Sequence, residues 1–120
     1  MKIKRVKIEN YRSIKSLKVN FLPYMVFVGK NNSGKSNIMM ALDAFFSNSL
    51  DLEDFRIEDG APVKELSITV QFCNLNDKER EIYAGKILNE GKTNETLIIR
   101  LTAALNENLD RIEWQTYEHQ

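Results

Sequence analysis

The sequence contains little cysteine and histidine, and it has no long apolar run. Among 120 residues there is one cysteine, Cys73, and one histidine, His119. This excludes an intrachain disulfide, favours a reducing compartment, and leaves too few ligands for a zinc site. The longest apolar runs, residues 24–28 and 38–42, are too short to cross a bilayer, and the N-terminus lacks the apolar core of a signal peptide. We therefore expect a cytoplasmic protein without a membrane partner.

Net charge is absent as well, because 17 basic residues balance 17 acidic ones. The overall charge therefore says nothing about an acidic partner, but the charges are segregated along the chain. Residues 43–59 are mainly acidic, whereas residues 1–18 carry one acidic group, Glu9, against seven basic ones: Lys2, Lys4, Arg5, Lys7, Arg12, Lys15 and Lys18. One interpretation is two oppositely charged solvated faces, and the other is a basic edge that contacts phosphate.

Apolar periodicity predicts an α/β chain in which three strands precede the first helix. A helix over residues 36–46 is apolar almost all round and is expected to be buried. A second helix should open at a capping box, Asn76 with Glu79, and run to about Asn89. The predicted strands, with antiparallel pairing expected among the later ones, cover residues 2–13 (with a bulge between Ile3 and Val6), 16–21, 24–28, 65–72, 96–105 and 110–117.

Between the third strand and the first helix, residues 29–36 spell GKNNSGKS, which matches the P-loop pattern G-x-x-x-x-G-K-[ST]. Gly29 and Gly34 permit the backbone angles that turn several N–H groups toward a phosphate chain. The following helix N-terminus favours an anion. Lys35 supplies positive charge for the β- and γ-phosphates, and the Ser36 hydroxyl is a suitable ligand for Mg²⁺. The pattern predicts an ATP site.

The alternative interpretation is a glycine-rich turn that binds no ligand. Such a turn would need neither a strand before it nor a helix after it, whereas both are predicted around this motif. We predict ATP and Mg²⁺ as cofactors, with Lys35 acting in catalysis and Ser36 holding the metal. The expected nucleotide-binding residues around the motif are Gly29, Lys30, Asn31, Asn32, Ser33, Gly34, Lys35, Ser36 and Asn37.

Residues 1–46 resemble the N-terminus of the SMC/RecF-like branch of ABC-type ATPases, and within that branch the OLD-family ATP-dependent endonucleases. Those proteins carry an N-[FY]-[RK] element after a basic strand, and the sequence Asn10-Tyr11-Arg12 stands at this place. They then carry a loop of the form G-x-N-x-[SA]-G-K-[ST], which residues 29–36 match. Asn32 occupies a position that is commonly glycine in SMC heads, and this favours the OLD-like group.

The resemblance implies a P-loop NTPase fold, in which residues 1–120 form the N-terminal lobe of an ABC-type ATPase head. Such a lobe has a mixed sheet around the P-loop helix and an antiparallel portion beside it. The resemblance also places Arg12 near phosphate and Ser13 near the base, whereas the plain alternative for Arg12 is a solvated arginine at a strand end. It further implies a head-to-head homodimer, DNA as a partner in repair or phage defence, and coupling to a Toprim nuclease.

Several parts of a complete ATPase site are missing from these residues. No apolar strand ends in Asp-Glu, and no Ser-Gly pair outside the P-loop offers an ABC signature. We therefore expect an N-terminal part of a larger ATPase, with weak nucleotide binding and negligible turnover without the remainder of the head.

Other residues are expected to have structural roles. The acidic segment Asp51–Asp54 should be a solvated loop, and Gln71 a plain strand residue. Met39 and Met40 should lie on the buried face of the P-loop helix. The aromatic residues of the later strands should pack rather than stack on bases, namely Phe72, Trp114 and Tyr117.

Two other function classes remain open from the sequence. A P-loop small-molecule kinase would usually start at the P-loop strand and continue with parallel βα repeats and lid arginines, which residues after Phe46 do not suggest. A non-catalytic lobe for dimerisation or DNA contact would use the basic residues 1–18, and salt-sensitive DNA binding without nucleotide would favour it.

Overall fold

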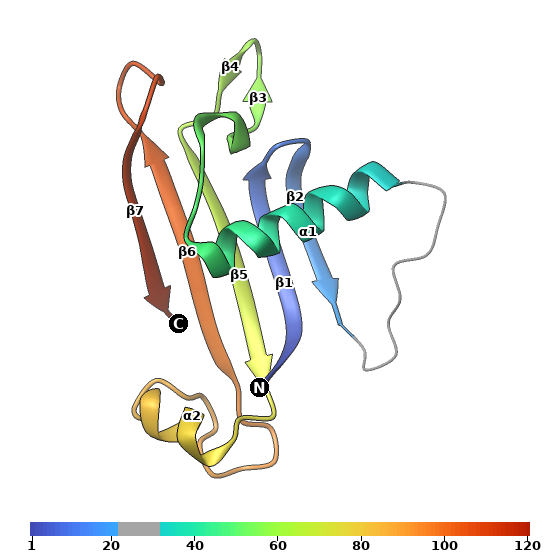
Figure 1. Cartoon of the computed structure of the whole chain (residues 1–120), viewed down its shortest axis with the longest axis vertical. Helices are drawn as coiled ribbons and strands as arrows, with labels where there is room; N and C mark the ends of the chain where they lie inside the picture. Colours follow the sequence, from blue (N-terminus) through green and yellow to red (C-terminus); the bar gives the residue numbers. More distant parts are fainter. Residues whose placement is uncertain (22–31) are drawn as a thin grey trace.

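The computed structural model describes residues 1–21 and 32–120, with side chains from Ser36 onward in the second range. One long helix crosses a sheet, and a small hairpin and a short helix lie at opposite ends of that sheet (Figure 1). The elements are β1 (Lys2–Tyr11), β2 (Ile14–Asn20), α1 (Asn32–Ser47), the 3₁₀ turn η1 (Leu52–Asp54), β3 (Ile57–Glu58), β4 (Ala61–Pro62), β5 (Glu65–Cys73), α2 (Asp77–Ile82), β6 (Leu97–Leu105) and β7 (Ile112–His119).

The main sheet has the strand order β2-β1-β5-β6-β7, and each neighbouring pair is antiparallel. This confirms the antiparallel portion of the predicted fold. The strand predicted over residues 24–28, around which a mixed sheet would be built, lies outside the described residues. A register shift between Ile3 and Arg5 confirms the bulge expected in the first strand.

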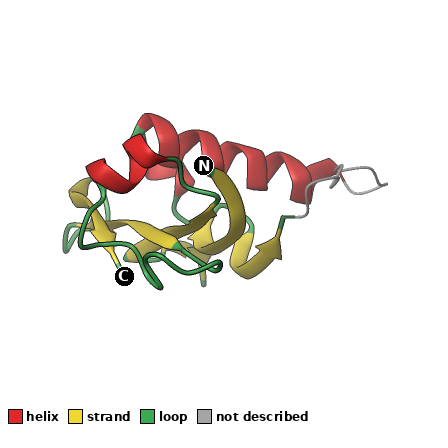
Figure 2. Ribbon diagram, turned by 90° about the horizontal axis from the view of Figure 1, so that it is seen from below, coloured by secondary structure: helices red, strands yellow, loops and turns green. Residues whose placement is uncertain are grey.

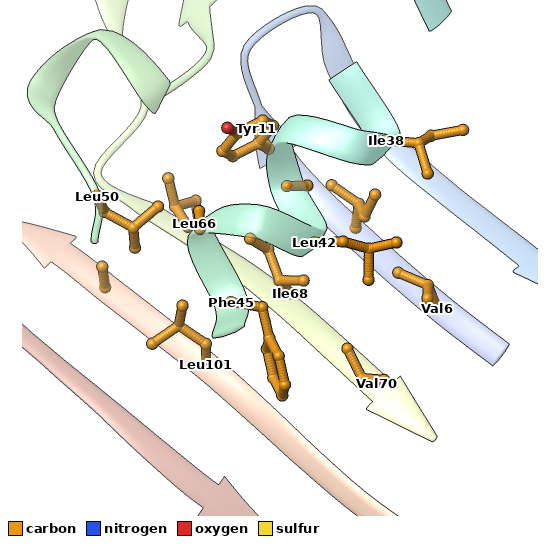
Figure 3. Packing of buried hydrophobic residues seen from close by; sticks show 14 of the residues in the cluster. Val6, Tyr11, Ile38, Leu42, Phe45, Leu50, Leu66, Ile68, Val70 and Leu101 are labelled. Atoms are coloured by element: carbon orange, nitrogen blue, oxygen red, sulfur yellow. The ribbon is translucent and has the colours of Figure 1, made fainter. Parts of the chain in front are cut away.

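The core lies between the sheet and α1 (Figure 3). On α1, Ile38, Ala41, Leu42 and Phe45 are buried, and this spacing of three and four residues places them on one helix face. Alternate residues of β5 meet them, from Leu66 to Phe72. Burying each large aliphatic or aromatic side chain contributes about 1.5–3 kcal/mol, so this layer is the main source of stability.

The prediction that α1 is buried on all sides was wrong. Met39 and Met40 are 53% and 41% exposed, and Phe46 is 59% exposed. Successive helical residues are rotated by about 100°, so positions outside the buried stripe are only partly covered by the sheet, although the Phe46 ring still lies 6.2 Å from that of Phe72. Within the described ranges no helix is long and apolar enough to span a membrane.

The short helix α2 confirms the predicted capping box but ends earlier than expected. The Glu79 N–H donates to Asn76 Oδ1 at 2.8 Å, and the Asn76 N–H donates to Glu79 Oε1 at 2.9 Å. The helix stops at Ile82 rather than near Asn89. Gly85 lies three residues after Ile82 and has φ +84°, a conformation that glycine adopts readily. This glycine stands six residues before Gly91, at which the helix was expected to stop.

The aromatic residues of the sheet differ in burial. Phe72 is 3% exposed and packs as predicted, whereas Trp114 is 43% exposed, contrary to the packing expected for it. Tyr117 is also exposed, at 36%, although its ring packs edge-on against Phe45 and its hydroxyl donates to the carbonyl oxygen of Phe45. Gln71 lies inside β5, as expected of a strand residue. The outer strand β7 is therefore less covered by α1 than the central strands.

Candidate nucleotide-binding site

The second half of the P-loop motif forms the beginning of α1. The helix starts at Asn32, four residues earlier than the sequence suggested, so residues 32–36 are helical. Its first turn contains no acidic residue, and Ser36 is exposed. Unpaired N–H groups and the helix dipole at such an end favour an anion. Gly29, Lys30 and Asn31 lie outside the described residues, and the structure describes only the backbone of Asn32, Ser33, Gly34 and Lys35.

A side-chain hydrogen bond joins α1 to the turn between β1 and β2. The Asn37 Nδ2 group donates to Ser13 Oγ at 2.5 Å. These residues are 24 positions apart in the sequence, and both were predicted to contact the nucleotide. The structure therefore brings the family-like "NYRS" turn against the helix that carries the P-loop lysine.

The turn itself has an unusual backbone. Asn10 and Arg12 have φ values of 59° and 51°, in the left-handed region that residues other than glycine and asparagine seldom adopt. For Arg12 this costs roughly 1–2 kcal/mol. The neighbouring segment fixes the conformation, because the Arg12 N–H donates to the Asp54 carbonyl at 2.7 Å and the Arg56 N–H donates to the Asn10 carbonyl at 3.1 Å. Strained positions of this kind cluster at functional sites.

The Arg12 guanidinium is paired with Asp54. Its Nε and Nη2 atoms lie 2.9 and 2.8 Å from Asp54 Oδ1, and the side chains are 34% and 6% exposed. The other carboxylate oxygen accepts the Asp51 N–H at 2.9 Å. Arg12 is therefore not the freely solvated arginine of the plain alternative, and Asp54 is not part of a solvated loop as predicted.

Tyr11 completes this cluster beneath the turn. Burial raises the pKa of its hydroxyl, and the nearby Asp54 carboxylate raises it further. The pKa of Arg12 is affected most by burial, which acts downward, but hydrogen bonds to Tyr11 and Asp54 outweigh it, so that the net pKa lies above the usual value. Arg12 thus stays cationic, with its charge fixed at the edge of α1 by a buried carboxylate.

Asp54 was not predicted to be a site residue, although the sequence contains a signal for it. The basic residues 1–18 and the acidic residues 43–59 are complementary, and the structure brings them together at Arg12 with Asp54 and, at 4.0 Å, at Lys15 with Glu58. The acidic segment is not a metal site either. In the part of the chain that the structure describes, no three His, Cys, Asp or Glu side chains are grouped to hold a metal ion.

Comparison with known proteins shows the family to which the chain belongs. A family model described as "AAA ATPase domain" matches residues 1–118. The chain belongs to this AAA ATPase domain family. A Helicobacter pylori (strain ATCC 700392 / 26695) protein named "ATP/GTP phosphatase" is 30% identical over 119 residues, which are 94% of this chain and 31% of that protein. The chain therefore spans about a third of that relative's length.

The fold is also similar to a solved SMC-type structure. That structure is described as "Structural biochemistry of ATP-driven dimerization and DNA stimulated activation of SMC ATPases". The TM-score is 0.62 at 18% identity, with coverage of 98% of this chain and 69% of the other. For this AAA ATPase domain, the likeness confirms the predicted fold class, an SMC/ABC-type head portion of a P-loop NTPase.

Proposed function

We propose that this chain supplies the phosphate-binding half of an ATP-hydrolysing site. The observation that carries the proposal is the junction of the GKNNSGKS motif with the N-terminus of α1, in a chain of the AAA ATPase domain family. Backbone N–H groups and Lys35 would hold the β- and γ-phosphates, and Ser36 would be a ligand of Mg²⁺. The Ser36 hydroxyl oxygen, at a helix start whose first turn has no acidic residue, is a chemically suitable ligand for Mg²⁺.

The turn after β1 would complete one wall of this site. Ser13 is held against Asn37, and Arg12 is fixed by Asp54 with about a third of its side chain exposed. A cation already oriented by a carboxylate loses little entropy on meeting a phosphate oxygen. The bound Mg²⁺ would neutralise developing phosphate charge, whereas Arg12 and Lys35 would orient the phosphate chain.

Hydrolysis needs a further part of the ATPase head. An acidic residue must hold Mg²⁺ and a further group must orient water, and the sequence offers no Asp-Glu strand end for this. Met39 and Phe46, seven residues apart, lie on the same flank of α1 and are 53% and 59% exposed, so the remainder of the head would cover this flank. The SMC relative's ATP-driven dimerisation supports a head-to-head dimer for the whole protein.

The proposed parent protein is a cytoplasmic ATPase of the SMC/RecF/OLD type that acts on DNA in repair or phage defence. Asn32 and the Asn10-Tyr11-Arg12 element support the OLD-like branch, in which a Toprim nuclease follows. Cleavage of duplex DNA by the full-length protein with Mg²⁺ would test this finer assignment. ATP hydrolysis without any DNA cleavage would place the protein outside the OLD-like branch.

The site itself is tested with Lys35→Ala in the full-length protein. We expect ATP affinity to fall by at least tenfold and turnover to be lost, because the cation facing the β- and γ-phosphates is removed. Lys92→Ala, at an exposed lysine in the loop before β6, is the matched control and should leave both quantities unchanged. Unchanged turnover in Lys35→Ala would contradict the proposal. Robust turnover by residues 1–120 alone would contradict the need for a further part.

A P-loop kinase would transfer phosphate to a small molecule rather than to water. Phosphate release by the full-length protein with ATP as the sole substrate favours the ATPase, and release that requires an added acceptor favours the kinase. The antiparallel sheet of the described residues supports the ATPase, because it differs from the parallel βα repeats of such kinases.

A further inference from the structure

The sheet face opposite α1 is polar and carries a row of cations. Figure 2 shows α1 on one side of the sheet, and the register tells which strand residues face the other side. Lys7 of β1 lies opposite Lys18 of β2 and opposite Thr69 of β5, and Thr69 lies opposite Arg100 of β6. These residues alternate with the buried ones, so their side chains share the face that α1 does not cover.

A shallow hollow on this face collects the cations. The residues that line it include Arg5, Lys7, Lys18 and Arg100, and none of its lining residues in the described part of the chain is a carboxylate. Like charges directly opposite each other in a sheet are destabilising, as for Lys7 and Lys18. In a chain whose net charge is zero, this concentration of positive charge indicates an anionic partner.

The cations are held weakly enough to exchange their present partners for phosphate. Lys7 Nζ lies 3.3 Å from Glu9 Oε1, and both side chains are about 40% exposed. Arg5 Nε donates to Asn20 Oδ1 at 2.7 Å, and Arg100 Nε donates to Thr69 Oγ1 at 3.2 Å. The Gln120 side-chain amide also lies 3.0–3.1 Å from the Arg100 guanidinium nitrogens. Exposed ion pairs and uncharged hydrogen-bond partners of this kind contribute little to stability. A polyanion that offers several phosphates at once would replace them.

The chemistry of the hollow favours double-stranded DNA over other polyanions. Protein partners are usually anchored by buried aromatic residues, and single strands stack their bases on aromatic side chains. The lining of the hollow contains no aromatic residue among the described positions. The row from Lys18 to Arg100 spans three strand spacings, roughly 14 Å, which is wider than the roughly 6 Å minor groove of a duplex. It can therefore contact phosphates on both strands.

We propose that this cationic sheet face, defined by Arg5, Lys7, Lys18 and Arg100, binds the phosphate backbone of double-stranded DNA without reading its sequence. The proposal rests on the proposed function, in which DNA is the partner of the parent ATPase. It adds which surface is used, and it separates the face from the candidate nucleotide site, which lies on the α1 side of the sheet. Arg12 is not part of this face, because it lies on the α1 side, where it lines a hollow with Met40 and Asp54.

The test measures binding of a labelled duplex of mixed sequence to the full-length protein without nucleotide, over a range of salt concentrations. Four phosphate contacts predict a slope of log affinity against log salt of about −3.6, or a loss of about 150-fold between 50 and 200 mM salt. The variant Lys7→Gln/Lys18→Gln should reduce the slope to about −1.8 and weaken binding about 30-fold near 0.15 M salt.

Matched variants show whether charge at this face is responsible. Lys7→Arg/Lys18→Arg keeps both charges and should bind like the wild type, and Lys78→Gln/Lys86→Gln, at exposed lysines in and after α2, should do so too. Glu118→Gln removes the carboxylate opposite Arg100 and should strengthen binding a few-fold. All variants should retain ATP hydrolysis and wild-type thermal unfolding, which shows that the fold is intact.

Three results would overturn the proposal. These are an unchanged salt slope in Lys7→Gln/Lys18→Gln, equal losses in the Lys78→Gln/Lys86→Gln control, and binding of an equally long single strand or RNA duplex that is as tight as that of the DNA duplex. Failure of the nucleotide site is distinguishable, because Lys35→Ala should abolish turnover and leave nucleotide-free DNA binding intact.

Discussion

Removing the Arg12 side chain should destabilise the protein even when no nucleotide is present. If Arg12 were a solvated arginine that waits for a phosphate, Arg12→Ala would change ATP affinity and leave stability unaltered. The structure instead gives it a structural partner, because two of its nitrogen atoms bind one oxygen of a nearly buried carboxylate, at 2.8 and 2.9 Å. A double-mutant cycle with Asp54 separates these two cases.

The expected magnitude follows from the exposure of the two side chains. Removing one partner of a buried ion pair costs about 3–5 kcal/mol, whereas an exposed pair contributes about 0–1 kcal/mol. Asp54 is 6% exposed and Arg12 is 34% exposed, so the pair lies between these limits. Asp54 also keeps the N–H of Asp51 as a partner after Arg12 is lost. We expect Arg12→Ala to cost about 2 kcal/mol, and the coupling energy to be about 1.5 kcal/mol.

Equilibrium urea unfolding of the wild type, Arg12→Ala, Asp54→Ala and the double variant gives this coupling energy directly. Lys15 and Glu58 form a matched control pair, because their charges are 4.0 Å apart and their side chains are 74% and 45% exposed. Their coupling should stay below about 0.3 kcal/mol. A coupling for Arg12 and Asp54 no larger than that of the control pair would refute the reasoning. ATP affinity of Asp54→Asn then tests positioning, since it should fall although Arg12 itself is retained.

Two further predictions concern the core and the loop before β6. Phe45 is 4% exposed and packs edge-on against Tyr117 at 5.5 Å, so Phe45→Ala should lower the free energy of unfolding by about 3–5 kcal/mol, measurable in urea; a loss below 1 kcal/mol would contradict the observed packing. The pKa of Glu95 is lowered, first by the Gly91 N–H and then by Arg80, so this carboxylate stabilises the folded state above its unfolded pKa of about 4.5. Stability should therefore fall as the pH drops below about 4.5, and Glu95→Gln should weaken that dependence of the thermal midpoint; an unchanged pH profile in the variant would argue against this role.

The predictions from sequence succeeded where local chemistry decides the outcome. Apolar alternation from Leu66 to Phe72 identified a half-buried strand, since one face of a sheet must meet the core. The spacing of Asn76 and Glu79 identified a helix start, because the capping bonds join residues three apart. The helix expected after the GKNNSGKS motif was predicted in the same way, and it is present from Asn32 onward.

The predictions failed where packing over long sequence distances decides. The length of the apolar run in α1 suggested burial on all sides, but one sheet can cover only one face of a helix, and Met39 and Met40 are left exposed. Asp54 was assigned to solvent because nothing near it in the sequence needs a carboxylate. Its partner, Arg12, is 42 residues away, and only the fold brings the two together.

The basic N-terminal segment shows why the sequence alone could not assign its side chains to the two faces of the sheet. In a regular strand, Ile3, Arg5 and Lys7 would share one face, and a one-residue slip would exchange the two faces. The bulge between Ile3 and Arg5 breaks this alternation, so that Ile3 packs against the core while Arg5 joins Lys7 on the opposite face. The same basic run thereby supplies an arginine that pairs with Asp54 beside α1 and a cationic row on the other side of the sheet. A single irregular position in β1 thus decides that Arg5 lies with Lys7 on the face proposed to bind DNA.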